Sequence, residues 1–144
     1  MKIESMKISQ YDEIYALWQI TTKRALSDAD SRENLEKYLR RNEGMSQVAI
    51  IDDKIVGTVL AGHDGRRGFI HHMAVLPQYR RHGIARAMAD AAVQKLYEDG
   101  IKKTHIFVFR DNGLGQSFWP SIGWKKCDDL TVYSFDAEGD ESEI

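Results

Sequence analysis

The chain has 144 residues and a formal net charge of −2, with 29% charged and 42% hydrophobic residues. This length lets one compact domain bury a core without metal ions or disulfides, and the composition excludes a disordered or membrane-embedded chain. No apolar run approaches the ~20 residues of a membrane span, and the opening MKIESMKISQYDEI lacks the apolar stretch of a secretion signal. We therefore expect a cytoplasmic protein.

The first half of the chain predicts one strand, two helices and then three strands. Ile14, Leu17 and Trp18 have the spacing of one helical face. Beyond the second helix the apolar period changes from helical to alternating, and Asp64-Gly65 is a strong hairpin signal. The expected elements, in chain order, are residues 1–6, 9–24, 31–42, 46–53, 55–63 and 69–75.

The second half predicts a helix, a strand, a short helix and a last strand. The first helix begins after Pro77 and carries a mostly alanine face, and Gly100 stands where a left-handed residue would end it. That face, which allows close packing on a sheet, consists of Ala85, Met88, Ala89, Ala92 and Leu96. The remaining elements are expected over residues 104–109, 114–123 and 130–136.

Together these elements predict a single α/β domain over residues 1–135, in the order βααβββαβαβ. Its sheet would be mixed and mainly antiparallel, flanked by helices, with one parallel crossover. Residues 136–144 form an acidic tail, which is either a frayed end or a screen for a basic groove. The one cysteine, Cys127, cannot form an internal disulfide and gives no metal signature, so we expect no metal site.

The turn LPQYRRHG, residues 76–83, combines basic side chains, a glycine and a helix start. The first N–H groups of a helix have no partner inside it, and the helix dipole adds about half a positive charge there. Gly83 would let the backbone approach a bulky phosphate, and Arg80 and Arg81 add charge. A pyrophosphate would fit this turn, which matches neither the Walker nor the Rossmann glycine pattern.

The run RRHGIA, residues 80–85, resembles the Arg/Gln-x-x-Gly-x-Gly/Ala signature of the GNAT superfamily of N-acetyltransferases. Its context MAVLPQYR is similar to the strand ending that precedes the signature in that family. The later stretch DNGLGQSFWPSIGW looks like the family's second conserved block. The resemblance covers residues 3–135, is nearest to small bacterial members of unassigned substrate, and implies the family fold and acetyl-coenzyme A as co-substrate.

The resemblance also implies which residues would hold coenzyme A. The pantetheine arm would enter where the strand 69–75 and the strand 104–109 splay apart, and the backbone of the first would pair with it. Asn112 matches an Asn that touches this arm, although such a residue is also a common turn or cap former. The expected coenzyme A residues are Met73, Ala74, Val75, Arg80, Arg81, His82, Gly83, Ile84, Ala85 and Asn112.

Two consecutive histidines, His71 and His72, are the candidates for a general base. Neighbouring strand residues point to opposite faces, so only one of them can face the cleft. His71 matches the family position that often carries a Glu or His, and its ordinary pKa of ~6.5 suits proton acceptance near neutrality. We expect His71 to act, directly or through a water, and His72 less so; the alternative is that both are structural.

Trp119 stands where the family usually carries a tyrosine as general acid. An indole N–H cannot give up a proton at these pH values, so Trp119 is expected to line the thioester pocket instead. A thiol of pKa ~8.5 is already a fair leaving group, so losing the acid slows the reaction rather than abolishing it.

Direct acetylation of a primary amine in a ternary complex is the leading hypothesis, because Cys127 lies beyond the motifs and offers no acyl-enzyme. The alternative is a coenzyme A-binding sensor or regulatory module that has lost turnover, as Trp119 would allow. The acceptor would be a small-molecule or peptide amine, and a homodimer is possible. We expect no nucleic acid or membrane partner. A cationic acceptor could be attracted by Asp28, Asp30, Glu33 and Asp64, unless these form only an exposed face.

Overall fold

The computed structural model describes residues 1–139, and the chain forms two compact units, Met1–Phe107 and Val108–Ile144. The first unit holds a five-stranded sheet whose strands follow chain order, β1-β2-β3-β4-β5. Neighbouring strands are antiparallel except for the parallel pair β4 and β5. The strands are β1 (Lys2–Ser5), β2 (Gln47–Ile51), β3 (Lys54–His63), β4 (Gly68–Val75) and β5 (Thr104–Ile106).

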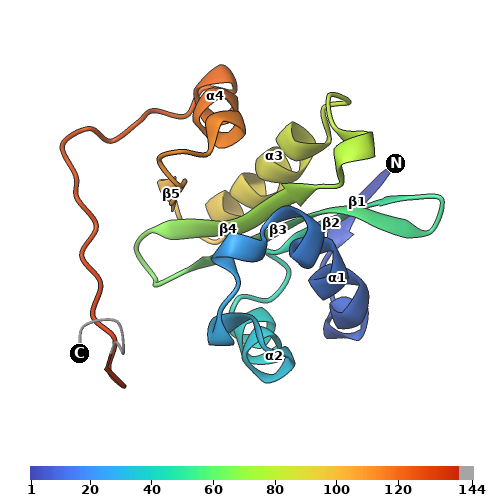
Figure 1. The fold of residues 1–144 in the computed structure, drawn as a ribbon, viewed down its shortest axis with the longest axis horizontal. Helices are drawn as coiled ribbons and strands as arrows, with labels where there is room; N and C mark the ends of the chain where they lie inside the picture. The colour runs from blue at the N-terminus through green and yellow to red at the C-terminus, as the bar shows by residue number, and fades with distance from the viewer. Residues whose placement is uncertain (140–144) are drawn as a thin grey trace. The chain divides into compact units, whose positions relative to one another are not determined.

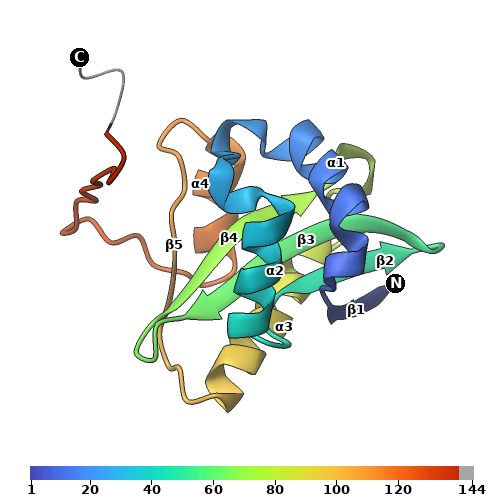
Figure 2. The same cartoon turned by 90° about the horizontal axis from the view of Figure 1, so that it is seen from below.

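Helices cover both faces of this sheet. On one face lie α1 (Tyr11–Thr21) and α2 (Arg32–Arg41), and on the other lies α3 (Ile84–Glu98), as Figures 1 and 2 show. The second unit contains one helix, α4 (Gly113–Ser121), among its described residues. This arrangement confirms the predicted α/β class with a mixed, mainly antiparallel sheet and one parallel crossover.

The small side chains of α3 let it approach the sheet closely. Ala89 and Ala92 are buried, and Gly57 of β3 lies beneath the helix. A Cβ atom at Gly57 would come within 2.8 Å of Met88 Cε and 3.2 Å of the Ala74 carbonyl oxygen. The opposite face of the sheet packs on larger side chains, which include Ile14, Trp18 and Leu35.

A β-bulge interrupts β4 near its middle. Thr58 pairs with Ala74 whereas Leu60 pairs with His71, so a single β3 residue, Val59, lies opposite His72 and Met73 together. His72 has a left-handed backbone, with φ of 47°. Such bulges bend a strand and redirect its side chains, and they occur frequently beside functional sites.

The predicted last strand is wrong. Residues 130–136 form no strand, and Leu130, Val132, Tyr133 and Phe135 are exposed. Alternating apolar residues predict a strand only where a neighbouring strand accepts its backbone hydrogen bonds, and no such pairing forms here. The strand predicted over 104–109 is likewise shorter, since only Thr104–Ile106 pair with β4.

The acidic tail is described only in part. Asp136 forms a turn in which its carboxylate accepts a hydrogen bond from the Glu138 N–H at 3.0 Å. Asp140, Glu141 and Glu143 lie outside the described residues. Among residues 1–139, no helix has both the length and the apolar content to cross a membrane.

Candidate functional site

The turn between β4 and α3 has an unusual backbone. Arg81 and Gly83 both adopt left-handed conformations, with φ of 67° and 76°, and Gly83 is the N-cap of α3. No side chain caps this helix. The first N–H groups of α3 are therefore left for an external acceptor, and left-handed residues at a helix start form the kind of concave N–H cluster that binds anions.

Basic side chains surround this turn. Arg80, Arg81 and His82 are exposed, whereas Ile84 is buried and anchors the first turn of the helix. Arg80 Nε donates a hydrogen bond of 3.1 Å to the carbonyl oxygen of Val75, which ties the turn to the end of β4. The turn thus offers backbone N–H groups and exposed positive charge in one place, as an anionic pyrophosphate requires.

The edge of β4 that leads to this turn is open over most of its length. On the β5 side, the registered pairs run only from Gly68↔Thr104 to Ile70↔Ile106. Met73, Ala74 and Val75 lie beyond the last of these pairs. Such short pairing is expected where two strands diverge. The unpaired backbone of β4 can form hydrogen bonds with a ligand that adds to the sheet edge as a further strand would.

His71 is exposed and lies next to the bulge of β4, on the sheet face that α1 and α2 cover. The prediction that His71 and His72 point to opposite faces is wrong, because the bulge interrupts the alternation and His72 contacts the same face. The ring of His71 meets Tyr38 of α2 edge-on, with 6.5 Å between the ring centroids. Partial burial, together with the nearby charge of His72, lowers the pKa of His71, although Asp30 acts in the opposite direction. The imidazole is therefore neutral at neutral pH and able to accept a proton.

Tyr38 is a neighbour of His71 that the sequence did not single out. Burial raises the pKa of Tyr38 to about 12, so the side chain stays a neutral phenol. Its hydroxyl group is buried and has no hydrogen-bond partner within the described residues. No sequence signal indicates that Tyr38 meets His71, because the two residues lie far apart in the chain.

His72 has a different environment from its neighbour. Its side chain is only 4% exposed, and its ring stacks on Trp18 with 4.3 Å between centroids. Nδ1 lies 2.8 Å from Thr22 Oγ1, and Nε2 lies 3.0 Å from Asp30 Oδ1. Both ring nitrogens are occupied inside the protein, so His72 is not available to a substrate.

The acidic residues proposed to attract an amine do not act alike. Burial opposes ionisation of Asp30, but the hydrogen bond from His72 and its charge outweigh this and lower the pKa of Asp30. Asp64 lies apart, in the hairpin between β3 and β4, where the N–H groups of Arg67 and Arg66 lower its pKa. Asp30 is thus committed to His72, and Asp64 to its own turn.

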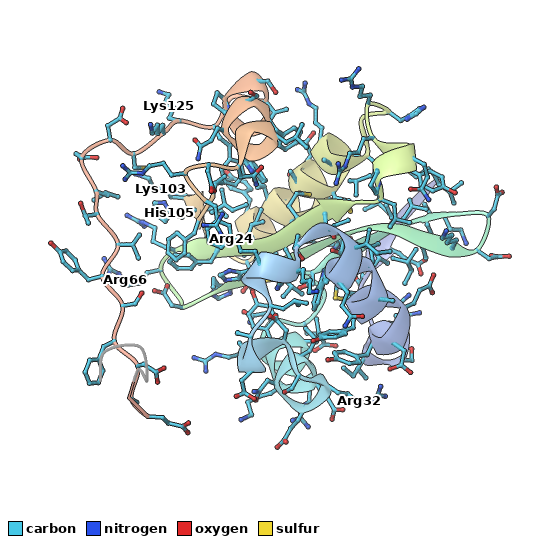
Figure 3. All side chains as sticks on the ribbon, in the orientation of Figure 1. Arg24, Arg32, Arg66, Lys103, His105 and Lys125 are labelled. Carbon is cyan, nitrogen blue, oxygen red and sulfur yellow. The ribbon has the colours of Figure 1, made fainter. Side chains whose placement is uncertain are left out.

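Asp28 in the loop before α2 and Glu33 in the first turn of α2 are exposed, but basic residues lie in the same part of the chain. Figure 3 shows Arg24 after α1 and Arg32 at the start of α2. The Arg32 guanidinium carbon lies 5.8 Å from the ring centroid of Tyr11. The surface is therefore of mixed charge rather than acidic.

Asn112 and Trp119 belong to the second unit. Asn112 caps α4, because its Oδ1 accepts a hydrogen bond of 3.1 Å from the Gly115 N–H. The ring centroid of Trp119 lies 4.6 Å from that of Trp124 and 5.0 Å from that of Phe118. The cap role foreseen for Asn112 is present, and Trp119 belongs to an aromatic cluster.

No metal site emerges from the described part of the chain. Within residues 1–139, no group of three His, Cys, Asp or Glu side chains lies close enough together to hold a metal ion. Cys127 is a free, exposed thiol. The candidate functional features of the first unit are instead the turn before α3, the open edge of β4 and the two histidines.

Comparison with known proteins points to one family. The model of the acetyltransferase (GNAT) family matches residues 11–124. AAC(6')-Iy, solved with the bisubstrate analogue CoA-S-monomethyl-acetylneamine, is similar in fold, with a TM-score of 0.76 and 19% identity over 94% of this chain and 97% of that one. The PaiA N-acetyltransferase of Thermoplasma acidophilum, solved with coenzyme A, has a TM-score of 0.73 and 18% identity over 86% and 89%.

A third similar structure is a ribosomal-protein-alanine N-acetyltransferase from Brucella melitensis biovar Abortus 2308. Its TM-score is 0.70, with 22% identity over 94% of this chain and 97% of that one. At such identities these structures show a shared fold, whereas the family match confirms the resemblance carried by RRHGIA and its flanking strand.

Proposed function

Because the chain belongs to the acetyltransferase (GNAT) family, acetyl-coenzyme A is its acetyl donor, and we propose that it acetylates a primary amine by direct transfer in a ternary complex. The observation that carries this proposal is the turn before α3, where left-handed Arg81 and Gly83 precede an uncapped helix start. The acceptor is a small-molecule or peptide amine. A homodimer and a cytoplasmic location stay predictions.

Residues of the first unit fit the donor in two stretches. The N–H groups of residues 83–85 and the charges of Arg80 and Arg81 would hold the pyrophosphate, and open space surrounds the Cα of Gly83. The open edge of β4 at Met73–Val75 would pair with the amide groups of pantetheine. When bound there, acetyl-coenzyme A supplies a thioester whose acetyl carbon the amine attacks.

His71 is the base in this proposal. Its lowered pKa keeps the imidazole neutral, so it can take a proton from the acceptor ammonium or amine, directly or through a water. The amine nitrogen then forms its bond to the acetyl carbon, the carbon–sulfur bond breaks, and the thiolate is protonated by water. Trp119, at the position where the family usually carries a tyrosine, does not donate this proton, because an indole N–H is not acidic enough.

A coenzyme A-binding sensor or regulatory module without turnover is the second candidate. The observation that favours it is Trp119, which lies in an aromatic cluster with Phe118 and Trp124 and occupies the position of the usual acid. Detectable acetyl transfer to any amine would exclude this candidate.

The first test is calorimetric titration of acetyl-coenzyme A into the wild type, Gly83→Trp and Gly100→Trp. Gly100 is the matched control, because it lies at the other end of α3 and also has a left-handed backbone and open space around its Cα. We expect micromolar binding by the wild type and the control, and at least a tenfold loss in Gly83→Trp. Absence of wild-type binding would overturn both candidates.

A screen of amines follows if binding is found. Transfer by the wild type that falls strongly in His71→Ala would support the enzyme with His71 as base. Transfer unaffected by His71→Ala would support the enzyme but reject that role.

A further inference from the structure

One buried ring connects both ends of the loop between α1 and α2. The loop, residues 22–31, begins with Thr22 directly after α1 and reaches Asp30 just before α2. His72 Nδ1 lies 2.8 Å from the Thr22 hydroxyl, and His72 Nε2 lies 3.0 Å from the Asp30 carboxylate. A single residue of β4 thus contacts both ends of the loop, and the Tyr11 hydroxyl of α1 also donates to the Asp30 carbonyl oxygen at 2.7 Å.

The hydrogen bonds at Asp30 have a fixed direction. Asp30 is a carboxylate, and its second oxygen accepts a hydrogen bond of 3.0 Å from the Ser27 N–H. A carboxylate only accepts, so Nε2 of His72 donates to Asp30. The contact of Nδ1 with Thr22 is a hydrogen bond in either state of the ring: a neutral ring accepts from the hydroxyl, and a charged ring donates to it while the hydroxyl donates to the Trp18 carbonyl oxygen at 3.5 Å. Each polar atom then has a partner, which is what a buried network requires to be stable.

The ring and backbone of His72 are fixed from the other side as well. Trp18 stacks on the ring, and the Trp18 indole N–H donates to Thr58 Oγ1 at 2.9 Å. Thr58 in turn donates to the carbonyl oxygen of His72 at 2.9 Å. The loop is therefore bound to a residue that cannot shift without disturbing the bulge of β4, where His71 is the adjacent residue.

We propose that His72 is a positioning residue that fixes the loop 22–31 at a set distance from His71 and so determines how tightly the amine acceptor binds. The inference rests on the proposed function, because it assigns to this loop one wall of the acceptor site. Opening the loop at both ends breaks both hydrogen bonds of this ring. His72 itself touches no reactant.

The test uses substitutions that change one atom or group each. Thr22→Val and Asp30→Asn weaken one end of the loop while keeping the side-chain shape. Thr21→Val is the matched control, because the Thr21 hydroxyl donates only to the Leu17 carbonyl oxygen of its own helix, at 2.8 Å. Backbone hydrogen exchange of residues 23–31 reports on the loop, and steady-state kinetics report on the acceptor.

The kinetic probes are acetyl-coenzyme A with spermidine, kanamycin or a short peptide that begins with alanine. In Thr22→Val and Asp30→Asn we expect faster exchange in the loop and a KM for the amine raised about threefold to tenfold, the factor expected for one lost hydrogen bond. We expect kcat and the Kd of acetyl-coenzyme A to stay within twofold. Thr21→Val should match the wild type in all four quantities.

Other outcomes overturn the inference. Unchanged loop exchange in both variants would show that the ring does not hold the loop. Faster exchange with an unchanged KM, or a loss confined to kcat, would show that the loop is held but does not position the amine. If the wild type acetylates none of the three amines, the proposed function fails and the positioning role fails with it, while the exchange data still report whether the loop is held.

Discussion

The turn 76–83 and the loop 22–31 both lie against β4, and they are built in opposite ways. The turn is shaped by its backbone, with left-handed residues at Arg81 and Gly83 and exposed basic side chains. The loop is shaped by side chains, through the hydrogen bonds of His72 to Thr22 and Asp30. The turn should therefore tolerate most side-chain changes but not a change of backbone preference. The loop should instead be sensitive to changes of the side chains that form its hydrogen bonds.

The two adjacent histidines provide the strongest test of this contrast. We expect His72→Ala to lower the free energy of unfolding by about 3–5 kcal/mol, because it leaves the buried Asp30 carboxylate without its partner. His71→Ala, at the exposed neighbouring position, should change it by about 0.5 kcal/mol or less. Urea denaturation of both variants measures the difference, and equal effects would mean that the buried cluster adds no stability.

Gly83 tests the turn through its backbone. A β-branched residue disfavours the left-handed conformation, so Gly83→Val should lower the free energy of unfolding by about 1–2 kcal/mol. It should also weaken acetyl-coenzyme A binding at least tenfold. Gly83→Asn is the control, because Asn tolerates this conformation, and it should retain binding within a few-fold by calorimetry. Equal losses in both variants would indicate that side-chain bulk, and not backbone conformation, limits the turn.

The pH dependence of transfer tests His71 directly. The pKa of His71 lies below the ordinary histidine value of ~6.5, so the base is still neutral at that pH. We therefore expect kcat/KM to begin to fall only at lower pH, and then by about tenfold per pH unit. His71→Ala should lose this acidic limb but keep the limb caused by ionisation of the amine itself. An acidic limb that survives in His71→Ala would assign the base to another group.

Arg81 should give the smallest effect. Its guanidinium is exposed, and a single exposed charge contributes about 0.2–1 kcal/mol. We therefore expect Arg81→Ala to weaken acetyl-coenzyme A binding about fivefold or less, and less still at high salt, as calorimetry at two ionic strengths would show. A loss as large as that in Gly83→Val would mean that the side chain, rather than the backbone, forms the anion site.

The turn and the helix after it could be predicted from sequence because their signals are local. The alanine face predicts a close approach of this helix to the sheet, and Gly100 predicts a left-handed residue at its end; both are present. The family signature lies in the same stretch, so the expected pyrophosphate site needed no knowledge of distant residues. The alternation of a regular strand predicts opposite faces for His71 and His72, and this prediction was wrong, because the bulge of β4 turns both rings toward α1 and α2.

The His72 cluster could not be predicted, because its partners are far apart in the chain. Thr22 and Asp30 meet His72 only after α1 packs on β4 and the bulge sets the register. Asp30 was grouped with the exposed acids Asp28 and Glu33, although its burial separates it from them. The prediction of a strand at 130–136 was wrong for a related reason, because an alternating apolar pattern does not show which strand would pair with it.

Gly57 shows how far the geometry of the open β4 edge depends on residues outside it. A methyl group there would meet Met88 Cε, which can move, and the carbonyl oxygen of Ala74, which moves only with β4 itself. Gly57 also pairs with Val75, the last residue of that strand. Because Gly57 has no side chain, β4 can lie where it does, and the position of the strand edge that is expected to bind pantetheine depends on this glycine. Substitution of Gly57 by a larger residue should therefore change the affinity for acetyl-coenzyme A, although Gly57 itself would not contact the coenzyme.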